Sequence, residues 1–430
     1  MFKEYVLGFG NSNFTASFSA ERVINEIEGK AFSEITDVAS SVRAALNDPI
    51  GSPALNAIVQ KGEKIAIIAS DITRHWIRHD LFLPIMLDEL NAAGIPDSDI
   101  TLMVALGTHR HHTNKENLLC YGREVVERIT IMQSNGLNSD DFSYVGTTSR
   151  GTETYINSHI VNADKVILTG GIVYHAMAGF GGGRKSILPG VCGYSTIQAN
   201  HRFCLSAEVG QGVNTECETG KLANNPMHED AMEIAALVKP DFILNVVLTP
   251  EGGFARFVAG AWEKAWLEGC KTVKEIFGIP IKEKTDLVIA SAGGFPKDIN
   301  LYQGVKTICN ACLAAKPEGV VIVLLECRDI AEPPEFSGWF EYDSLYEHEL
   351  SLRQEFTVPG FIALKVGYIA QQIPLIIVTL PENKIFIEKA GMIPATTLDE
   401  ALLIAEEKLN RKDYTISVIS HGANTVPIFE

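Results

Sequence analysis

Chemically useful side chains gather in one glycine-rich stretch, Thr169 to Arg202, which reads TGGIVYHAMAGFGGGRKSILPGVCGYSTIQANHR. It contains eight glycines together with His175, Lys185 and His201. Glycine adopts positive φ without steric strain, so the glycines after Ala178 predict a loop that is shaped around a bound group. Backbone amides of such a loop suit the phosphate of a nucleotide-like cofactor. The cofactor-binding residues expected in this loop are Gly181, Gly182, Gly183, Arg184 and Lys185.

The same loop has two other interpretations. Gly179 to Ser186 reads GFGGGRKS, which is close to the phosphate-binding pattern GxxxxGK[ST] of nucleotide hydrolases. Arg184 replaces the last glycine of that pattern, however, and Pro189 interrupts the helix that should follow. A plain surface turn would also use glycines. Neither alternative explains the further polar clusters along the chain.

Two predicted strands end on polar side chains that could belong to the same site. Lys64 to Ser70 and Ile100 to Leu106 are continuous apolar runs, typical of buried parallel strands, and an amphipathic helical pattern separates them. The first run is followed by Asp71 and Arg74, and the second by His109. Ligands of parallel α/β sheets bind at the carboxyl ends of strands. These side chains are therefore expected near a ligand.

The alternation of strand and helix patterns predicts an α/β fold with two α/β domains and mostly parallel sheets. A restart of the strand and helix rhythm at Asp286 places the domain boundary near Gly278. We expect a cofactor-binding domain over residues 1–277 and a second domain over 278–410. The last predicted strand, Tyr414 to Ile419 within residues 411–430, is expected to return to the first domain. Further strands are predicted at Ile129–Met132, Lys165–Leu168, Phe242–Leu248, Asp286–Ser291, Val320–Leu325 and Leu375–Val378.

Composition narrows the class of partner. The chain has 430 residues, 46% of them hydrophobic, and 36 basic against 53 acidic residues give a formal charge of −17. That charge argues against nucleic acid and against anionic membranes as partners. No signal-like or membrane-spanning apolar run occurs, which predicts a cytoplasmic protein. The eight scattered cysteines fit reduced thiols, and CxxC at Cys309 and Cys312 fits helix packing better than a zinc site.

Four motifs together resemble the nickel-pincer lactate racemase family, in the same order and over nearly the whole chain. They are DITR at Asp71, GTHR at Gly107, YHAMAGFGGGRKSILPGV at Tyr174 with its downstream His201, and SAGGFPKDINLYQGVK at Ser291. The resemblance implies two α/β domains with the active site in the cleft between them. It also implies a pyridinium mononucleotide with sulfur groups, attached to a lysine through a thioamide and holding nickel.

The resemblance also implies a role for each matching residue. Lys185 would bear the cofactor, and His201 would be the nickel ligand. His109 and His175 would be the catalytic acid–base pair, and Asp71 would steady a histidine or the cofactor. The substrate would be bound by Arg74, Gln303 and Lys306. Enzymes that synthesise the cofactor would be partners, and a homo-oligomer is left open.

These residue types suit racemisation of a 2-hydroxy acid. Removing the C2 proton beside a carboxylate would create an unstable carbanion, whereas removing hydride leaves a stable 2-keto acid. Two histidines are then needed, because the two enantiomers present their hydroxyl on opposite sides, and imidazole titrates near neutral pH. Arginine binds a carboxylate through two parallel hydrogen bonds, which would let Arg74 orient C2.

Three alternatives remain open from the sequence. His75 follows Arg74 where lactate racemases have proline, which leaves room for a larger substrate, such as a malate-like or sugar acid. A zinc-dependent hydrolase would use His109 with His111 and His112. A non-catalytic nickel or nucleotide carrier would need only the loop, Lys185 and His201. The sequence assigns no role to His75, His111 or His112 within the racemase interpretation.

Overall fold

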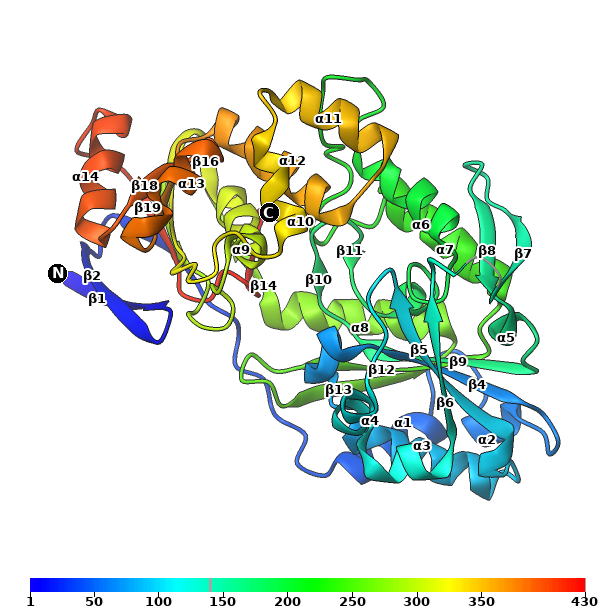
Figure 1. Ribbon diagram of the computed structural model, residues 1–430. Helices are drawn as coiled ribbons and strands as arrows, with labels where there is room; N and C mark the ends of the chain where they lie inside the picture. Colours follow the sequence, from blue (N-terminus) through cyan, green and yellow to red (C-terminus); the bar gives the residue numbers. More distant parts are fainter. Residues whose placement is uncertain (139–140, 430) are drawn as a thin grey trace. The chain divides into compact units, whose positions relative to one another are not determined.

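The computed structural model describes residues 1–138 and 141–429, and the chain forms two compact units (Figure 1). Unit 1 consists of Met1–Lys30, Cys204–Thr215 and Glu275–Glu430. Unit 2 consists of Ala31–Phe203 and Glu216–Lys274. Each unit is built around its own six-stranded sheet. None of the helices in the described part of the chain is both long and apolar enough to cross a membrane.

The sheet of unit 2 is parallel except for one edge strand. Its order is β13 (Phe254–Gly260), β12 (Phe242–Leu248), β9 (Lys165–Gly171), β4 (Ile65–Ser70), β5 (Ile100–Gly107) and β6 (Thr130–Asn135). Only β13 runs antiparallel to its neighbour. The central strands consist mostly of apolar residues because they are buried on both faces.

Helices cover this sheet and fix the strand ends. Figure 1 shows α1, α3 and α4 along one face, where their apolar side chains share a core with the sheet. The elements outside the sheet are α1 (Val38–Asn47), α2 (Leu55–Ile58), α3 (His79–Ala92), α4 (Asn114–Arg128), α5 (Ser158–Val161), α6 (Tyr194–His201), α7 (Pro226–Val238), α8 (Trp262–Phe277) and the hairpins β7 (Phe142–Thr147) with β8 (Glu153–Asn157) and β10 (Tyr174–His175) with β11 (Gly179–Phe180).

The sheet of unit 1 is entirely parallel. Its order is β18 (Ile393–Ala395), β17 (Leu375–Val378), β16 (Ala315–Leu324), β15 (Thr285–Ser291), β19 (Ile416–Ile419) and β3 (Val23–Ile27). One face packs on α9 and α12, and the other on α14 and a two-stranded hairpin. The elements outside this sheet are β1 (Phe2–Phe9), β2 (Ser12–Ser19), β14 (Gly278–Ile281), β20 (Val426–Phe429), α9 (Leu301–Leu313), α10 (Pro334–Ser337), α11 (Leu345–Gln354), α12 (Val358–Gln372), α13 (Lys384–Lys389) and α14 (Leu398–Leu409).

The α/β class and the mostly parallel sheets agree with the sequence-based expectation, but the chain is divided differently. Unit 1 resumes at Glu275, close to the boundary expected near Gly278. The strand at Tyr414 to Ile419 was expected in the first domain, whereas β19 pairs with β15 and β3 in the sheet of unit 1. Residues 1–30 likewise belong to unit 1. The sequence pattern identifies strands, but the partner of a strand depends on packing between distant segments.

Candidate active site

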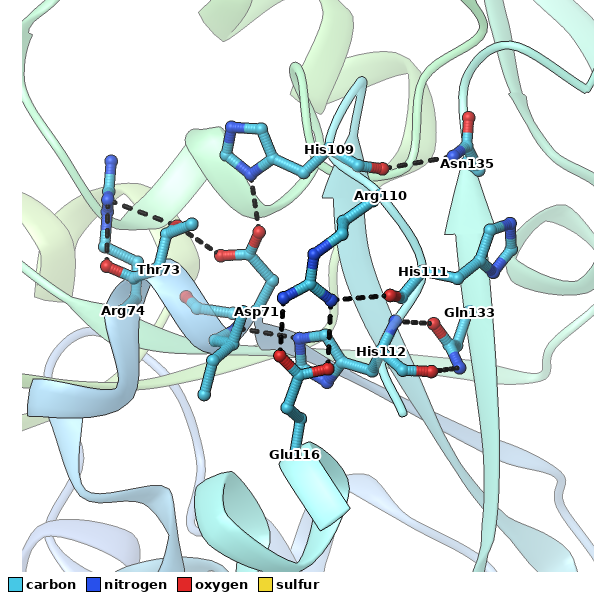
Figure 2. A network of polar contacts seen from close by, with 12 residues as sticks. Asp71, Thr73, Arg74, His109, Arg110, His111, His112, Glu116, Gln133 and Asn135 are labelled. Atoms are coloured by element: carbon cyan, nitrogen blue, oxygen red, sulfur yellow. Dashed lines mark hydrogen bonds and ion pairs between the residues drawn. The ribbon is translucent and has the colours of Figure 1, made fainter. Parts of the chain in front are cut away.

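Asp71 and His109 meet at the carboxyl ends of β4 and β5 (Figure 2). His109 Nδ1 lies 2.5 Å from Asp71 Oδ2, and the hydroxyl of Thr73 donates to Asp71 Oδ1 at 2.5 Å. Burial alone would raise the pKa of the Asp71 carboxyl, but hydrogen bonds from His109 and Thr73 and the nearby charge of Arg74 lower it below its ordinary value. The carboxylate is therefore ionised at neutral pH.

An ionised Asp71 fixes the tautomer of His109. A carboxylate accepts hydrogen bonds only, so Nδ1 of His109 carries the proton that it donates to Asp71. The neutral ring then has its lone pair on Nε2, and the side chain is 52% exposed. This arrangement lets His109 take a proton from a bound substrate. Arg74, which is exposed on the 3-10 helix Ile72–Ile77, is close enough to influence Asp71.

The other two histidines of the GTHRHHT segment do not join His109. His112 is buried, accepts a hydrogen bond from the amide of Ile72 at its Nε2 (2.7 Å) and places Nδ1 3.0 Å from Asn117 Oδ1. It therefore ties the segment after β4 to α4. His111 is exposed. Throughout residues 1–138 and 141–429, no three histidine, cysteine, aspartate or glutamate side chains are grouped to hold a metal, so the zinc interpretation gains no support.

His175 lies on the β10–β11 hairpin with its ring turned back onto its own turn. The amides of Met177 and Ala178 both donate to its Nδ1, at 3.2 and 3.1 Å. Desolvation places the pKa of His175 well below its ordinary value. The positive charges that lower this pKa further come, in decreasing order, from Lys185, Arg74, Arg184 and His201. The structure thus brings Lys185, Arg74, His175 and His201 of the expected site into one neighbourhood of unit 2.

His201 occupies the last position of α6 and is buried. Its Nδ1 donates to the carbonyl of Ile197 at 2.9 Å, so the neutral ring has its lone pair on Nε2. Burial, and then the charge of Lys185, lowers the pKa of His201 to about 3. A neutral imidazole whose Nδ1 proton is held by a carbonyl is the form that binds a metal through Nε2.

Buried polar contacts hold α6 in place. The side-chain amide of Asn200, the residue before His201, donates to Asp230 Oδ2 on α7 at 2.9 Å. Asp230 is fully buried and also accepts hydrogen bonds from the hydroxyls of Thr148 and Thr152. Because successive helical residues point about 100° apart, this anchor also sets the direction of His201.

The glycines before Lys185 are required by packing within the protein. Gly182 and Gly183 both have positive φ, and a Cβ on them would lie 2.8 Å from Asn245 Oδ1 and 2.5 Å from the Trp266 ring. The amide of Gly183 donates to Asn245 Oδ1, and Trp266 Nε1 donates to the carbonyl of Gly181. The loop is therefore closed around Asn245 and Trp266, which the sequence-based reasoning missed. The apolar spacing of α8 marks Trp266 as a core residue but does not show what it covers.

The side chain of Arg184 was expected to bind a cofactor phosphate, but it lies inside the protein. Its side chain is fully buried, with the guanidinium 4.2 Å from the centre of the Trp266 ring. Its terminal nitrogens donate to the carbonyls of Phe180 and Ala178 at 2.9 and 2.6 Å. Lys185, the next residue, lies in the loop's 3-10 helix, Gly183–Ser186, and is only half-buried. Within GGGRK, Lys185 is therefore the side chain that a bound group could reach.

The two substrate-binding residues expected from SAGGFPKDINLYQGVK belong to unit 1. Gln303 and Lys306 lie one turn apart on α9, and Lys306 Nζ donates to Gln303 Oε1 at 2.9 Å. Their amide and ammonium groups therefore occupy the same stretch of helix surface.

Comparisons with known proteins agree with this arrangement. The family models for the lactate racemase N-terminal and C-terminal domains match residues 9–212 and 281–426. The chain belongs to the lactate racemase family. It is an isomerase of the racemase class. A lactate racemase of Thermoanaerobacterium thermosaccharolyticum is 34% identical over 97% of both chains. A lactate racemase of Lactiplantibacillus plantarum is 36% identical over 67% of this chain and 66% of its own.

A solved structure supports the same membership. The lactate racemase apoprotein from Thermoanaerobacterium thermosaccharolyticum superposes with a TM-score of 0.88 at 32% identity and covers 99% of this chain and 100% of its own. The family resemblance inferred from the four motifs is thereby confirmed over nearly the whole chain.

Proposed function

We propose that this racemase interconverts the enantiomers of lactate by reversible hydride transfer at C2, with a nickel-pincer nucleotide attached to Lys185. The curated relatives that match over most of the chain are lactate racemases, which supports lactate as the substrate. The observation that carries the mechanism is the neighbourhood of His175, where Lys185, Arg74 and His201 come together.

The residues fit the proposed cofactor. His201 offers a neutral imidazole with its lone pair on Nε2. Lys185 offers a half-buried amine whose charge acts on His201. An imidazole nitrogen beside sulfur donors is a suitable ligand set for nickel. When bound, the cofactor would supply an electron-poor ring that accepts hydride from C2 and returns it. The glycines of the loop contribute its shape, because their neighbours are protein atoms.

The protein's own residues would handle the carboxylate and the hydroxyl proton. Arg74 would bind the substrate carboxylate with two parallel hydrogen bonds, which fixes the position of C2. His109, oriented by Asp71, would take the hydroxyl proton through Nε2. His175 would serve the oxygen of the opposite enantiomer. Gln303 and Lys306 would also bind the substrate.

A larger 2-hydroxy acid is the second candidate substrate. His75 stands directly after Arg74 and is half-buried, so it could donate a hydrogen bond to a distal polar group. Comparing D-lactate, L-lactate, malate and a sugar acid as substrates of one loaded preparation separates the two candidates.

Intact-mass and metal measurements test the cofactor assignment. The full chain would be produced together with the enzymes that synthesise the cofactor, and D- and L-lactate interconversion would be followed by chiral chromatography. Lys185→Ala should abolish the covalent adduct, whereas His201→Ala should keep the adduct and lose nickel. Lys221→Ala, a change at another lysine of unit 2, should retain both. An adduct that persists in Lys185→Ala would refute the assignment.

A further inference from the structure

Arg184 is a buried cation with neutral partners. Its side chain has no exposure, and burial lowers its pKa to about 9, with only the Cys270 thiol acting in the other direction. Among the residues that the structure describes, no carboxylate charge acts on its guanidinium. Removing an unpaired charge from water is costly. A neutral side chain could fill the same volume, so the guanidinium must contribute through its hydrogen bonds.

The guanidinium clamps the turn that follows His175. One terminal nitrogen donates to the carbonyl of Ala178 and the other to that of Phe180, as the planar fork of arginine allows. The guanidinium also lies over the Trp266 ring, 4.2 Å from its centre. Ala178 is therefore held at its carbonyl by Arg184 while its amide donates to His175 Nδ1.

The preceding residue, Met177, is held in a similar way. The amide of Met177 donates to His175 Nδ1, and the carbonyl of Met177 accepts a hydrogen bond from Asn225 Nδ2 at 2.8 Å. Both amides that face the ring thus belong to backbone that is fixed by buried side chains, Arg184 and Asn225.

We propose that Arg184 is a positioning residue for His175: by clamping Ala178 and Phe180 it keeps two backbone amides on Nδ1 and so holds the ring proton on Nε2. A nitrogen that accepts from two N–H groups cannot carry a proton of its own without opposing both. His109 has the opposite tautomer, because its Nδ1 proton is donated to Asp71. In this state His175 presents an N–H donor through Nε2 and His109 presents a lone pair through Nε2.

The inference extends the proposed function, because the use of the tautomer in catalysis rests on His175 acting on the substrate oxygen. The two histidines are then not equivalent at rest. His109 is ready to take the hydroxyl proton, and His175 is ready to donate a hydrogen bond to the oxygen of the substrate or of its keto form. The positioning itself is a property of the protein without cofactor.

Nitrogen NMR of the full-length protein without cofactor measures the tautomer directly. Histidine labelled with ¹⁵N would be incorporated, and the His175 signals assigned by their loss in His175→Gln. We expect wild type to show Nε2 protonated and Nδ1 with its lone pair. A protonated Nδ1 in the neutral ring would overturn the proposal without any variant at Arg184.

Substitutions at Arg184 then test whether this residue sets the tautomer of His175. Arg184→Lys keeps the charge and loses the fork, so we expect both tautomers of His175 to be populated. Arg184→Gln, which removes the buried charge and keeps a single amide donor, serves the same purpose if the lysine variant does not fold. Trp266→Phe is the matched control: it keeps the ring under the guanidinium and should leave the tautomer unchanged. A single Nε2–H tautomer in a folded Arg184 variant, or equal loss in Trp266→Phe, refutes the role.

Kinetic measurements on the enzyme loaded with cofactor test the catalytic role of Arg184. Arg184→Lys should lower kcat roughly 10- to 100-fold, the lower part of the range for acid–base groups, with KM, the Lys185 adduct and the nickel content unchanged. Loss of the adduct with a normal His175 tautomer would overturn the proposal, because Arg184 would then act on the cofactor. If the tautomer shifts as expected while wild type carries no adduct on Lys185, the positioning stands and the proposed cofactor chemistry fails.

Discussion

Single contacts decide which nitrogen of each histidine can react. Asp71 holds Nδ1–H of His109, two backbone amides occupy Nδ1 of His175, and the Ile197 carbonyl holds Nδ1–H of His201. His109, His175 and His201 thereby have different chemical properties. Their shared residue type would not distinguish them.

The Asp71 contact gives a prediction at this scale. Asp71→Asn keeps the size of the side chain, but its amide can donate to Nδ1 of His109 and move the ring proton to Nε2. We expect kcat of the loaded enzyme to fall roughly 10²- to 10⁴-fold, the range for an impaired general base, with little change in KM. Asp80→Asn, which removes a partner of the exposed Arg78, is the control and should stay near wild type. A kcat within a few-fold of wild type would mean that Asp71 does not direct His109.

Elements bring these residues together through packing that connects distant parts of the chain. The loop from Gly179 to Ser186 is closed on Trp266 of α8, and α6 is anchored to α7 through Asn200 and Asp230. Short glycine-rich and helical segments thus gain a fixed shape from buried partners outside the motif.

The closeness of Trp266 predicts a steric penalty at Gly183. Gly183→Ala would place a Cβ 2.5 Å from the ring at a φ of +55°, so both backbone strain and overlap oppose it. We expect the apoprotein to lose about 2 to 4 kcal/mol of unfolding free energy, the sum of ordinary strain and overpacking costs. Gly252→Ala is the matched control, since φ is +93° and no heavy atom lies within 4 Å, so it isolates the strain. Equal losses in urea titrations of the two variants would argue against the close packing.

The sequence pattern predicted where strands lie better than it predicted what packs against them. Continuous apolar runs located β4, β5 and β12, since buried parallel strands require them. The N-terminal hairpin was missed, although Tyr5, Leu7 and Phe9 alternate as buried positions in β1. The proposed roles of the site residues rest on motif and residue type, and they remain predictions. The phosphate expectation for Arg184 and the glycines did not anticipate Trp266, because no local pattern shows what packs over a loop.

Across the whole molecule, buried histidines make the folded state sensitive to acid. Burial lowers the pKa of His79, His201 and His228 to about 3, below the ordinary value of 6.5. Between those values the unfolded chain binds more protons than the folded one, so stability falls as pH drops from about 6.5 towards 3. Above pH 6.5 these histidines are neutral in both states, so they do not make the unfolding free energy depend on pH.

Replacing one of these histidines should weaken the pH dependence. His79 packs against the rings of Phe82 and Tyr121, so His79→Phe keeps an aromatic ring in place. We expect the slope of unfolding free energy between pH 6 and 4 to decrease by about 1.4 kcal/mol per pH unit, the value for one proton. His111→Gln, a change at an exposed histidine, should leave the slope unchanged. Urea titrations at several pH values provide the measurement, and an unaltered slope in His79→Phe would contradict the neutral buried state.

The pairing of β3 with β19 has a consequence for synthesis on the ribosome. Asn25 of β3 lies beside Ser417 of β19, so an edge strand made among the first residues finds its neighbour only when translation is almost finished. Residues 31–274 emerge earlier and contain all of unit 2. The nascent chain can therefore complete the unit that carries Lys185 and His201 while β3 still lacks its partner strand. A ribosome stalled before residue 416 would expose β3 to proteases.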